Sequence, residues 1–425
     1  MPGEIKKTSI PPKKKRNWKK IILISFGIFL VLVVLGNRKK KQQVFDTPET
    51  SSAREESVSV PAEYAALYEE LERELQSFEQ TLPEPTGNNQ IIFGAELLTA
   101  NTHRGEELLT DQALPGNFLM LDRLVSLGVE GVSVSLQYPI LLSSYPRSQE
   151  YWNFYRKLVS EIRKRKLTLH MDIGPVFTNP EYSSIRPNYL DLTKEEYLAG
   201  KKEIAVRIVH ELQPDYLTLV NEPSTESEII GFDISAQENN RFITDVAQEV
   251  SNNSVLLGAG SGTWESISYI ELYVKNPDVD YIDLHIYPIT NGITNYLDQA
   301  VAMAQIAHAQ NKKVIIGEVW LYKASATDLV RGASHPSIFA RDTYSFFAPL
   351  DQKMLDVIDR MSQSYDISYI SPFWSRYFFG YVPYESNRNK SDGQLLLDAN
   401  KASVENLLSG TPTSTGSYYQ KLISK

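Results

Sequence analysis

Two glutamates end apolar runs that lie far apart in the chain. Glu222 follows the run DYLTLVN and precedes Pro223, and Glu318 follows the run KKVIIG. A charged side chain beside a buried run is costly unless it is paired or functional. Two carboxyl groups in one pocket, one protonated and one ionised, can act as general acid/base and as nucleophile. For either glutamate alone, the alternative is a salt-bridged carboxylate at the rim of a core.

Polar residues also alternate with apolar ones in the run YIDLHIYP. A strand period of two places Asp283, His285 and Tyr287 on one face. We expect this face to point into the protein, with His285 and Tyr287 nearest its rim. From there both side chains could donate hydrogen bonds to Glu318.

Other candidates for ligand contact lie in or after further apolar runs. His170 and Asp172 are two residues apart in the run LTLHMDI, and Glu96 closes the run IIFGAE. Aromatic rings beside such carboxyl groups offer flat apolar surfaces for stacking, although each ring could equally be packed in the core. The rings concerned are Trp264, Trp320 and Trp374.

These positions converge only if the elements that carry them are arranged in a ring. From residue 90 onward, short apolar runs alternate with longer amphipathic ones, eight times over. Strands that alternate with helices indicate a parallel sheet. The predicted strands are Ile91–Glu96, Gly131–Leu136, Leu167–Ile173, Tyr216–Val220, Val255–Gly260, Tyr281–Ile286, Val314–Val319 and Ile367–Phe373.

Eight such units, with largely continuous apolar strands, predict an α/β fold of the (β/α)8 TIM barrel type. In this fold the carboxyl ends of the strands meet at one mouth, which holds the active site. Gly317 would leave room for a ligand or a neighbouring strand. An open doubly wound sheet is the alternative, but it should carry a Gly-rich phosphate loop after its first strand, and GAELLTAN is not one.

Four of these features together resemble clan A of the glycoside hydrolases. They are Asn221-Glu222-Pro223 on the fourth strand, His285-x-Tyr287 on the sixth, Glu318 on the seventh and Trp374 after the eighth. The resemblance covers about residues 91–382. Within the clan, the chain most resembles the arabinogalactan endo-β-1,4-galactanase and cellulase-like families.

The resemblance implies a retaining β-glycosidase that needs no cofactor and no metal. Glu222 would be the acid/base and Glu318 the nucleophile, held by Tyr287 with His285 nearby. Asn221 would contact the sugar 2-hydroxyl, and Trp374 would lie under the sugar. We expect further substrate contacts from the remaining candidates, namely Trp320, His170, Asp172 and Glu96.

The chain departs from the clan at the end of the second strand. The clan usually has an arginine there that keeps the nucleophile ionised, whereas this sequence has Gln137. Arg104, in the loop after the first strand, is a possible substitute. The departure supports an alternative function, a non-catalytic carbohydrate-binding envelope protein on a degenerate barrel. A second alternative is a metal-dependent hydrolase with His170, Asp172 and His285 as ligands.

Composition narrows the class of partner. The net charge of -9 includes a strongly basic N-terminus, so the rest of the chain is more acidic than the total indicates. An acidic body rich in Tyr and Trp argues against nucleic acid and suits a carbohydrate. The sequence has no cysteine, which excludes disulfides and thiolate metal sites. A monomer is the favoured oligomeric state.

The N-terminal region predicts a membrane anchor. Ile21–Asn37 carries no charge and is close to the lower length limit of about 17 residues for a spanning helix. The alternative is a cleaved signal peptide, but no small-x-small site follows the stretch. More Lys and Arg lie before it than after it, which predicts a single-pass protein of the cell membrane with a cytoplasmic N-terminus and an extracytoplasmic catalytic domain.

The predicted organisation has six parts. A basic cytoplasmic tail (1–20), the transmembrane anchor (21–37) and a polar linker (38–60) precede an extra helix with a hinge (61–89). The helix spans Pro61–Leu82, with apolar residues at three- and four-residue steps, and we expect it to pack against the barrel. The catalytic barrel covers 90–409, and a mobile C-terminal tail covers 410–425.

Overall fold

The computed structural model describes residues 59–85, 90–179, 183–251, 253–288, 292–325, 328 and 335–425. All eight predicted strands are present, and they form one parallel sheet in the order β1-β8-β7-β6-β5-β4-β3-β2. The strands are β1 (Ile92–Phe93), β2 (Gly131–Ser135), β3 (Thr168–Asp172), β4 (Tyr216–Val220), β5 (Leu256–Gly262), β6 (Tyr281–Ile286), β7 (Lys313–Val319) and β8 (Ile367–Pro372).

The sheet closes on itself between β1 and β2. Ser133 N–H donates to the Ala95 carbonyl at 3.1 Å, and Leu97 N–H donates to the Ser133 carbonyl at 2.9 Å. Glu96 and Ser133 form a parallel bridge at the same place. A closed parallel sheet with outer helices is a (β/α)8 barrel, so the predicted fold is confirmed.

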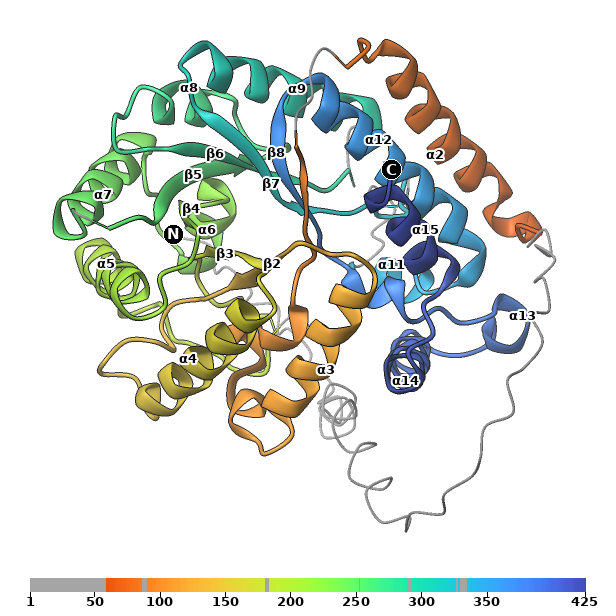
Figure 1. Cartoon of the computed structure of the whole chain (residues 1–425), viewed down its shortest axis with the longest axis horizontal. Coiled ribbons are helices and arrows are strands. Elements are labelled where there is room, and N and C mark those ends of the chain that lie inside the picture. Colours follow the sequence, from red (N-terminus) through yellow and green to blue (C-terminus); the bar gives the residue numbers. More distant parts are fainter. Residues whose placement is uncertain are drawn as a thin grey trace, which may run out of the picture.

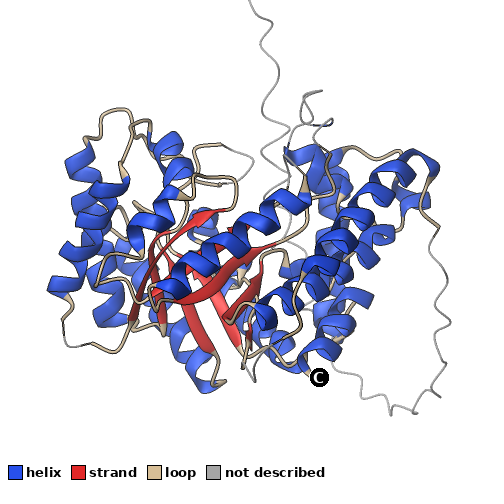
Figure 2. Cartoon of the chain, turned by 90° about the horizontal axis from the view of Figure 1, so that it is seen from above, coloured by secondary structure: helices blue, strands red, loops and turns tan. Residues whose placement is uncertain are grey.

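Helices surround the strands, as Figures 1 and 2 show. Thr193 and Glu196 form a capping box that starts one of them, with the Thr193 hydroxyl accepting from Glu196 N–H. The helices are α3 (Ala113–Ser126), α4 (Ser148–Lys164), α5 (Lys194–Glu211), α6 (Pro223–Ile230), α7 (Ala236–Glu249), α8 (Ser268–Tyr273), α9 (Ile293–Ala309), α11 (His335–Arg341), α12 (Ala348–Ser364), α13 (Tyr384–Asn387) and α14 (Asp392–Ser409).

The barrel interior holds large polar aromatics, and glycines on neighbouring strands make room for them. Tyr216, Tyr281 and Tyr369 cluster with Ile315 inside the barrel. A Cβ on Gly258 would lie only 2.2 Å from the Tyr281 ring. The glycine therefore leaves the volume that the tyrosine fills, which is how interiors reach close packing.

The extra N-terminal helix packs on the barrel, as predicted. Helix α2 (Ala62–Thr81) lies along the outer side of α12 and α9 (Figure 1) and buries Leu71, Leu75 and Phe78. The predicted cytoplasmic tail and membrane anchor, and the linker up to residue 58, lie outside the described residues. Among the helices that are described, none combines the length and apolar character needed to span a bilayer.

The prediction of a mobile C-terminal tail is wrong. Residues from Ser414 to Ile423 form helix α15, which packs on α12 (Figure 1). Tyr419 is fully buried, stacks on Phe378 at 4.8 Å between ring centroids, and donates to the Gly94 carbonyl at 2.7 Å. The Ser/Thr-rich composition concealed this helix because the Thr413 side chain caps its N-terminus and a few apolar residues fasten it.

Candidate active site

Glu222 follows β4 and Glu318 lies near the end of β7, and a β-bulge orients Glu318. The pairing between β6 and β7 skips Gly317, so that Leu284 faces Ile316 while His285 faces Glu318. Gly317 N–H donates to Asp283 Oδ1 at 2.8 Å, and a Cβ on this glycine would lie 2.4 Å from the same oxygen. Bulges re-aim side chains next to active sites. Here Asp283 fixes the bulge that turns Glu318 toward the mouth, and the predicted room beside Gly317 is occupied by the neighbouring strand.

Glu222 and Glu318 converge on one imidazole. His285 Nδ1 lies 2.8 Å from Glu222 Oε1 and 3.5 Å from Glu318 Oε2. Each of the three side chains offers one nitrogen or carboxylate oxygen atom, and these three atoms lie within 4.8 Å of one another. Tyr287 donates to Glu318 Oε2 at 2.6 Å. The face of β6 predicted from its alternation therefore points inward and contacts both carboxylates.

Asn221 is oriented from both ends of its amide. Its Nδ2 donates to Asp172 Oδ1 at 3.0 Å, and its Oδ1 accepts from Glu222 N–H at 2.9 Å. Ser135 donates to Asp172 Oδ2 at 2.8 Å and lies 3.3 Å from Glu96 Oε1. Asp172 thus holds Asn221 in place from inside the barrel.

Sequence reasoning missed Glu265, which supports the loop after Glu222. One of its carboxylate oxygens accepts from Ser224 N–H at 2.6 Å, and the other accepts from Ser261 Oγ and Gly262 N–H, both at 2.8 Å. Ser224 lies in the first turn of α6, for which Glu222 is the N-cap residue. The only sequence signal was its position next to Trp264, because the loop SGTWESIS has no periodicity.

Burial and neighbouring charges shift the pKa of the central groups. Burial raises the pKa of Glu318 to about 8; Asp172 and Glu222 add to the rise, while His285 and Tyr287 oppose it. Burial alone would lower the pKa of His285, but Glu318, Asp283 and Glu222 raise it well above its usual value. The three carboxylates therefore favour the cationic form of His285, which lies between the two glutamates.

Two further buried acids have opposite protonation preferences. Burial, Glu318 and Asp172 raise the pKa of Glu96 well above its usual value and so favour its neutral carboxyl form. Burial would also raise the pKa of Asp283, but His170 and His285 outweigh burial and lower it. Asp283 is therefore the ionised counter-charge beneath His285.

Neither Gln137 nor Arg104 takes the place of the arginine that the clan usually has after the second strand. The Gln137 side chain bonds to the Thr102 hydroxyl, and Gln137 N–H donates to the same oxygen at 2.7 Å. Arg104 pairs with Glu107 at 2.8 Å and donates to the Leu98 carbonyl. The suggestion that Arg104 substitutes is wrong, and the cation beside Glu318 is His285.

Two predicted substrate contacts lie within the protein instead of at the mouth. Both ring nitrogens of His170 are engaged, one by Ser133 and the other by Thr218, each at 3.0 Å. Trp320 is 3% exposed and stacks on Tyr377, with 5.5 Å between ring centroids. His170 has no ring nitrogen left for a ligand, and Trp320 has no open ring face. Both residues therefore support the barrel wall.

The other two tryptophans are partly exposed beside the carboxylates. Trp374 lies two residues after the end of β8 and packs its ring edge-on to Phe373, with the Arg376 guanidinium 4.4 Å from its centroid. Trp264 lies 6.0 Å from the ring of Tyr287. Ring contacts of Tyr287 with Trp264 and Phe373, and of Phe373 with Trp374, thus join the two tryptophans in one row of aromatic side chains.

The structure does not bring together the metal ligands considered above. Across the described ranges, the group of side chains close enough to share an ion is Glu222, His285 and Glu318, without His170 or Asp172. Asp172 instead bonds to Ser135 and Asn221.

Comparisons with known proteins bear on the fold. No protein-family model matches the sequence, and no curated protein sequence matches it. Among solved structures, an exo-β-1,4-mannosidase from Opitutaceae bacterium strain TAV5 is similar with a TM-score of 0.52 and 14% identity; the match covers 81% of this chain.

A β-mannanase from Bacteroides ovatus is similar with a TM-score of 0.43 and 15% identity over 79% of this chain and 93% of the mannanase. The match to the mannosidase covers 61% of that protein's own length. At these identities the likeness concerns the fold. The chain shares the (β/α)8 barrel of the mannosidase.

Proposed function

We propose that this chain is a retaining β-glycoside hydrolase, with Glu222 as acid/base and Glu318 as nucleophile. The observation that carries the proposal is the approach of the two carboxylates to within 4.8 Å across the barrel mouth. Retaining enzymes need their two carboxyl groups about 5–5.5 Å apart, whereas inverting enzymes leave room for a water between them. The short separation therefore favours the double-displacement mechanism.

In the first displacement Glu318 attacks the anomeric carbon while Glu222 gives its proton to the leaving oxygen. This step breaks the glycosidic bond and forms a glycosyl ester on Glu318. In the second, Glu222 removes a proton from water, and the resulting nucleophile attacks the same carbon and releases Glu318. Atoms and charge balance without a metal or an organic cofactor.

The neighbouring groups suit these roles. Tyr287 and the imidazolium of His285 stabilise the ionised form of Glu318. The Nδ2 group of Asn221 carries a second hydrogen that Asp172 does not use, and this hydrogen is available to a sugar 2-hydroxyl. Trp374 offers an apolar surface for the sugar ring.

The test replaces each glutamate by its isosteric amide in the full chain. Glu222→Gln and Glu318→Gln should each lower turnover of β-linked galactan, glucan or mannan by about 10³-fold, because each removes one essential group. Glu203→Gln, which changes an exposed glutamate, is the matched control. Wild-type turnover in either variant would contradict the proposal.

The alternative function is carbohydrate binding without hydrolysis. Its support is Gln137 at the position of the usual arginine, together with the raised pKa of Glu318. Glycan binding without any hydrolysis between pH 6 and 10 would favour this alternative.

We also propose that the protein is anchored in the cell membrane with the barrel outside. The support is the uncharged stretch Ile21–Asn37 and its flanking charges in the sequence. Protease treatment of intact cells should remove the barrel, while the basic N-terminus stays protected. Release of the whole chain by alkaline carbonate would contradict the anchor.

A further inference from the structure

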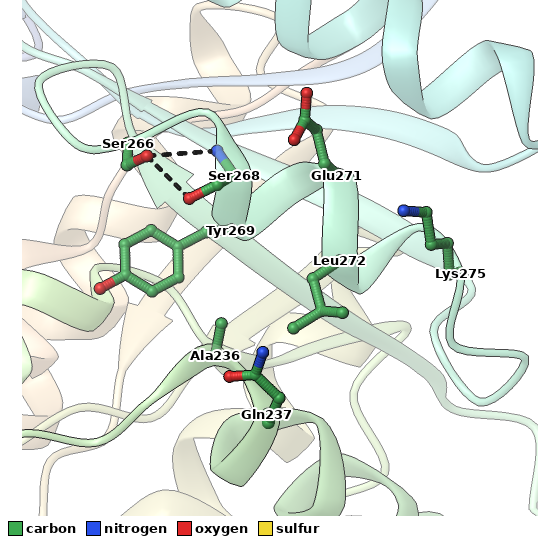
Figure 3. Close-up of a pocket in the computed structure, with 8 residues that line it drawn as sticks. All are labelled: Ala236, Gln237, Ser266, Ser268, Tyr269, Glu271, Leu272 and Lys275. Atoms are coloured by element: carbon green, nitrogen blue, oxygen red, sulfur yellow. Dashed lines mark hydrogen bonds between the residues drawn. The ribbon is translucent and has the colours of Figure 1, made fainter.

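A hollow lies between α7 and α8, outside the candidate catalytic centre. Its volume is about 430 Å³, and Figure 3 shows the side chains around it. Ala236 and Gln237 open α7, and Ser266, Ser268 and Tyr269 lie at the start of α8. Each barrel helix starts near the carboxyl end of the preceding strand, so these residues lie at the same end of the barrel as the mouth. Glu271, Leu272 and Lys275 continue the lining along α8 and past its end.

One wall of the hollow is a supported aromatic platform. Tyr269 is half-buried and stacks on Tyr273, with 6.2 Å between centroids and 29° between planes. Tyr273 is fully buried, and its hydroxyl accepts from Asn239 Nδ2 at 3.2 Å. Tyr269 is therefore held from beneath, and its apolar ring surface suits the C–H face of a sugar.

The rest of the lining offers uncommitted hydrogen-bonding groups. Among the described residues, no hydrogen bond or ion pair engages the side chains of Gln237, Glu271 or Lys275, which lie below or to the right of Tyr269 in Figure 3. The hydroxyls of Ser266 and Ser268 lie 2.7 Å apart and bond only with local groups. An aromatic platform ringed by an amide, hydroxyls and single charges of both signs is chemistry that fits a polyhydroxylated ligand better than an apolar one.

The hollow connects to the acid/base side of the centre through a short hydrogen-bonded path. Ser266 directly follows Glu265, and Glu265 holds Ser224, two residues after Glu222. The acid protonates the leaving oxygen, so the leaving group lies on the Glu222 side of the bond. A chain that continues past the leaving group would run toward this hollow.

We infer that the hollow between α7 and α8 is an outlying subsite that binds a sugar unit of the leaving-group portion of a polysaccharide. The inference rests on the proposed function and deepens it: the substrate is a chain of several β-linked sugars, cut internally. Tyr269 supplies the stacking surface, and Gln237 the hydrogen bonds.

The experiment compares short and long substrates in the full chain. The probes are 4-nitrophenyl β-glycosides and β-1,4-linked hexasaccharides of mannose, glucose and galactose. Tyr269→Ala should lower kcat/KM about fivefold for whichever hexasaccharide the protein cleaves, because one aromatic contact with the sugar chain is lost. The kcat/KM for the short 4-nitrophenyl glycoside should stay unchanged. Tyr269→Phe, which keeps the ring, should retain at least half of the hexasaccharide activity.

Tyr365→Ala is the matched control, since Tyr365 is also partly exposed but precedes β8 at the opposite end of the barrel. Equal hexasaccharide kinetics for wild type and Tyr269→Ala would overturn the subsite while leaving the proposed hydrolase intact. Full turnover by Glu318→Gln would instead overturn the hydrolase.

Binding gives a second readout that does not depend on turnover. In the Glu318→Gln background, calorimetry should show a fivefold weaker hexasaccharide Kd after Tyr269→Ala. An unchanged Kd, or no binding of any of the three hexasaccharides, would overturn the subsite.

Discussion

At the residue scale, the ionisation of Glu318 controls what the centre can do. Its carboxyl is buried and has acidic neighbours, and only His285 and Tyr287 stabilise its charge. In the proposed mechanism Glu318 must be ionised to act as the nucleophile, so its raised pKa predicts activity on the alkaline side of neutrality. In the clan that the sequence resembles, an arginine stabilises the ionised nucleophile. In the proposed mechanism the imidazolium of His285 has this role.

This arrangement predicts a pH profile. The acid limb of kcat/KM should have its midpoint near pH 8, because Glu318 ionises with a pKa of about 8. Tyr287→Phe removes a hydrogen bond that favours the charged form, so the limb should move to higher pH and activity at pH 7 should fall about tenfold. The control is Tyr155→Phe, which removes a buried hydroxyl that bonds to the Ala100 carbonyl. An acid limb below pH 6 would contradict this picture.

The same three side chains predict inhibition by zinc. Glu222, His285 and Glu318 offer two carboxylates and an imidazole close enough to share an ion, with small adjustments. Zn²⁺ would occupy both catalytic groups, so millimolar Zn²⁺ should inhibit hydrolysis and EDTA should restore it. If EDTA instead abolishes the activity of protein to which no zinc has been added, a metal-dependent hydrolase is favoured.

At the element scale, irregular strand pairing positions the carboxylates. Strand β7 bulges at Gly317 against β6, and the pairing of β4 with β5 also shifts, between Thr218 and Val220. Both irregularities fall within two residues of a candidate catalytic glutamate or its Asn221 neighbour. A regular ladder would turn these side chains to the other face.

Gly317→Ala tests the bulge. The new Cβ would lie 2.4 Å from Asp283 Oδ1, so the bulge or the aspartate must move, and Glu318 with it. Activity should fall at least a hundredfold, because displacement of a catalytic group by about 1 Å has that effect. Gly174→Ala is the control, since its Cβ would meet nothing nearer than Asn221 at 3.7 Å. Kinetics like wild type in Gly317→Ala would contradict a role for the bulge.

A buried ion pair joins α5 to α6, the helix whose N-cap residue is Glu222. Lys201 Nζ lies 2.7 and 2.8 Å from the two oxygens of Glu226, and Tyr197 donates to the same carboxylate at 2.7 Å. Lys201→Met leaves that buried carboxylate uncompensated and should lower the free energy of unfolding by about 3–5 kcal/mol, measured by urea denaturation. Lys201→Met/Glu226→Gln should regain most of it. No recovery in the double variant would contradict a charge effect.

At the scale of the whole molecule, segments outside the barrel fasten its ends. Helix α2 covers α12 and α9, and α15 packs on α12 while Tyr419 reaches the backbone of Gly94, just after β1. Because β1 has only two residues in regular strand geometry, this contact supports the point where the barrel closes.

Tyr419→Ala should therefore destabilise the barrel itself. Loss of a fully buried aromatic side chain costs about 3–5 kcal/mol, and Tyr419→Phe, which loses only the hydrogen bond to Gly94, about 1 kcal/mol. The measurement is denaturant unfolding followed by far-UV circular dichroism. An unfolding midpoint unchanged in Tyr419→Ala would show that α15 is not part of the folded barrel.

The sequence by itself determined the eight strands, the closed barrel and the inward face of Asp283, His285 and Tyr287. These follow from local periodicity, since continuous apolar runs and period-two alternation are set by which face is buried. It also singled out Glu222 and Glu318, because a carboxyl group at the end of a buried run is conspicuous.

Only the tertiary structure decided which polar residues meet. It put His170 and Trp320 inside the wall, paired Arg104 with Glu107, brought Glu265 to the loop after Glu222 and folded 414–423 onto the barrel. Apart from the local Arg104–Glu107 pair, the partners in these contacts, such as His170 and Thr218 or Tyr419 and Gly94, are tens to hundreds of residues apart. Such contacts depend on packing across the closed barrel, which no local pattern encodes.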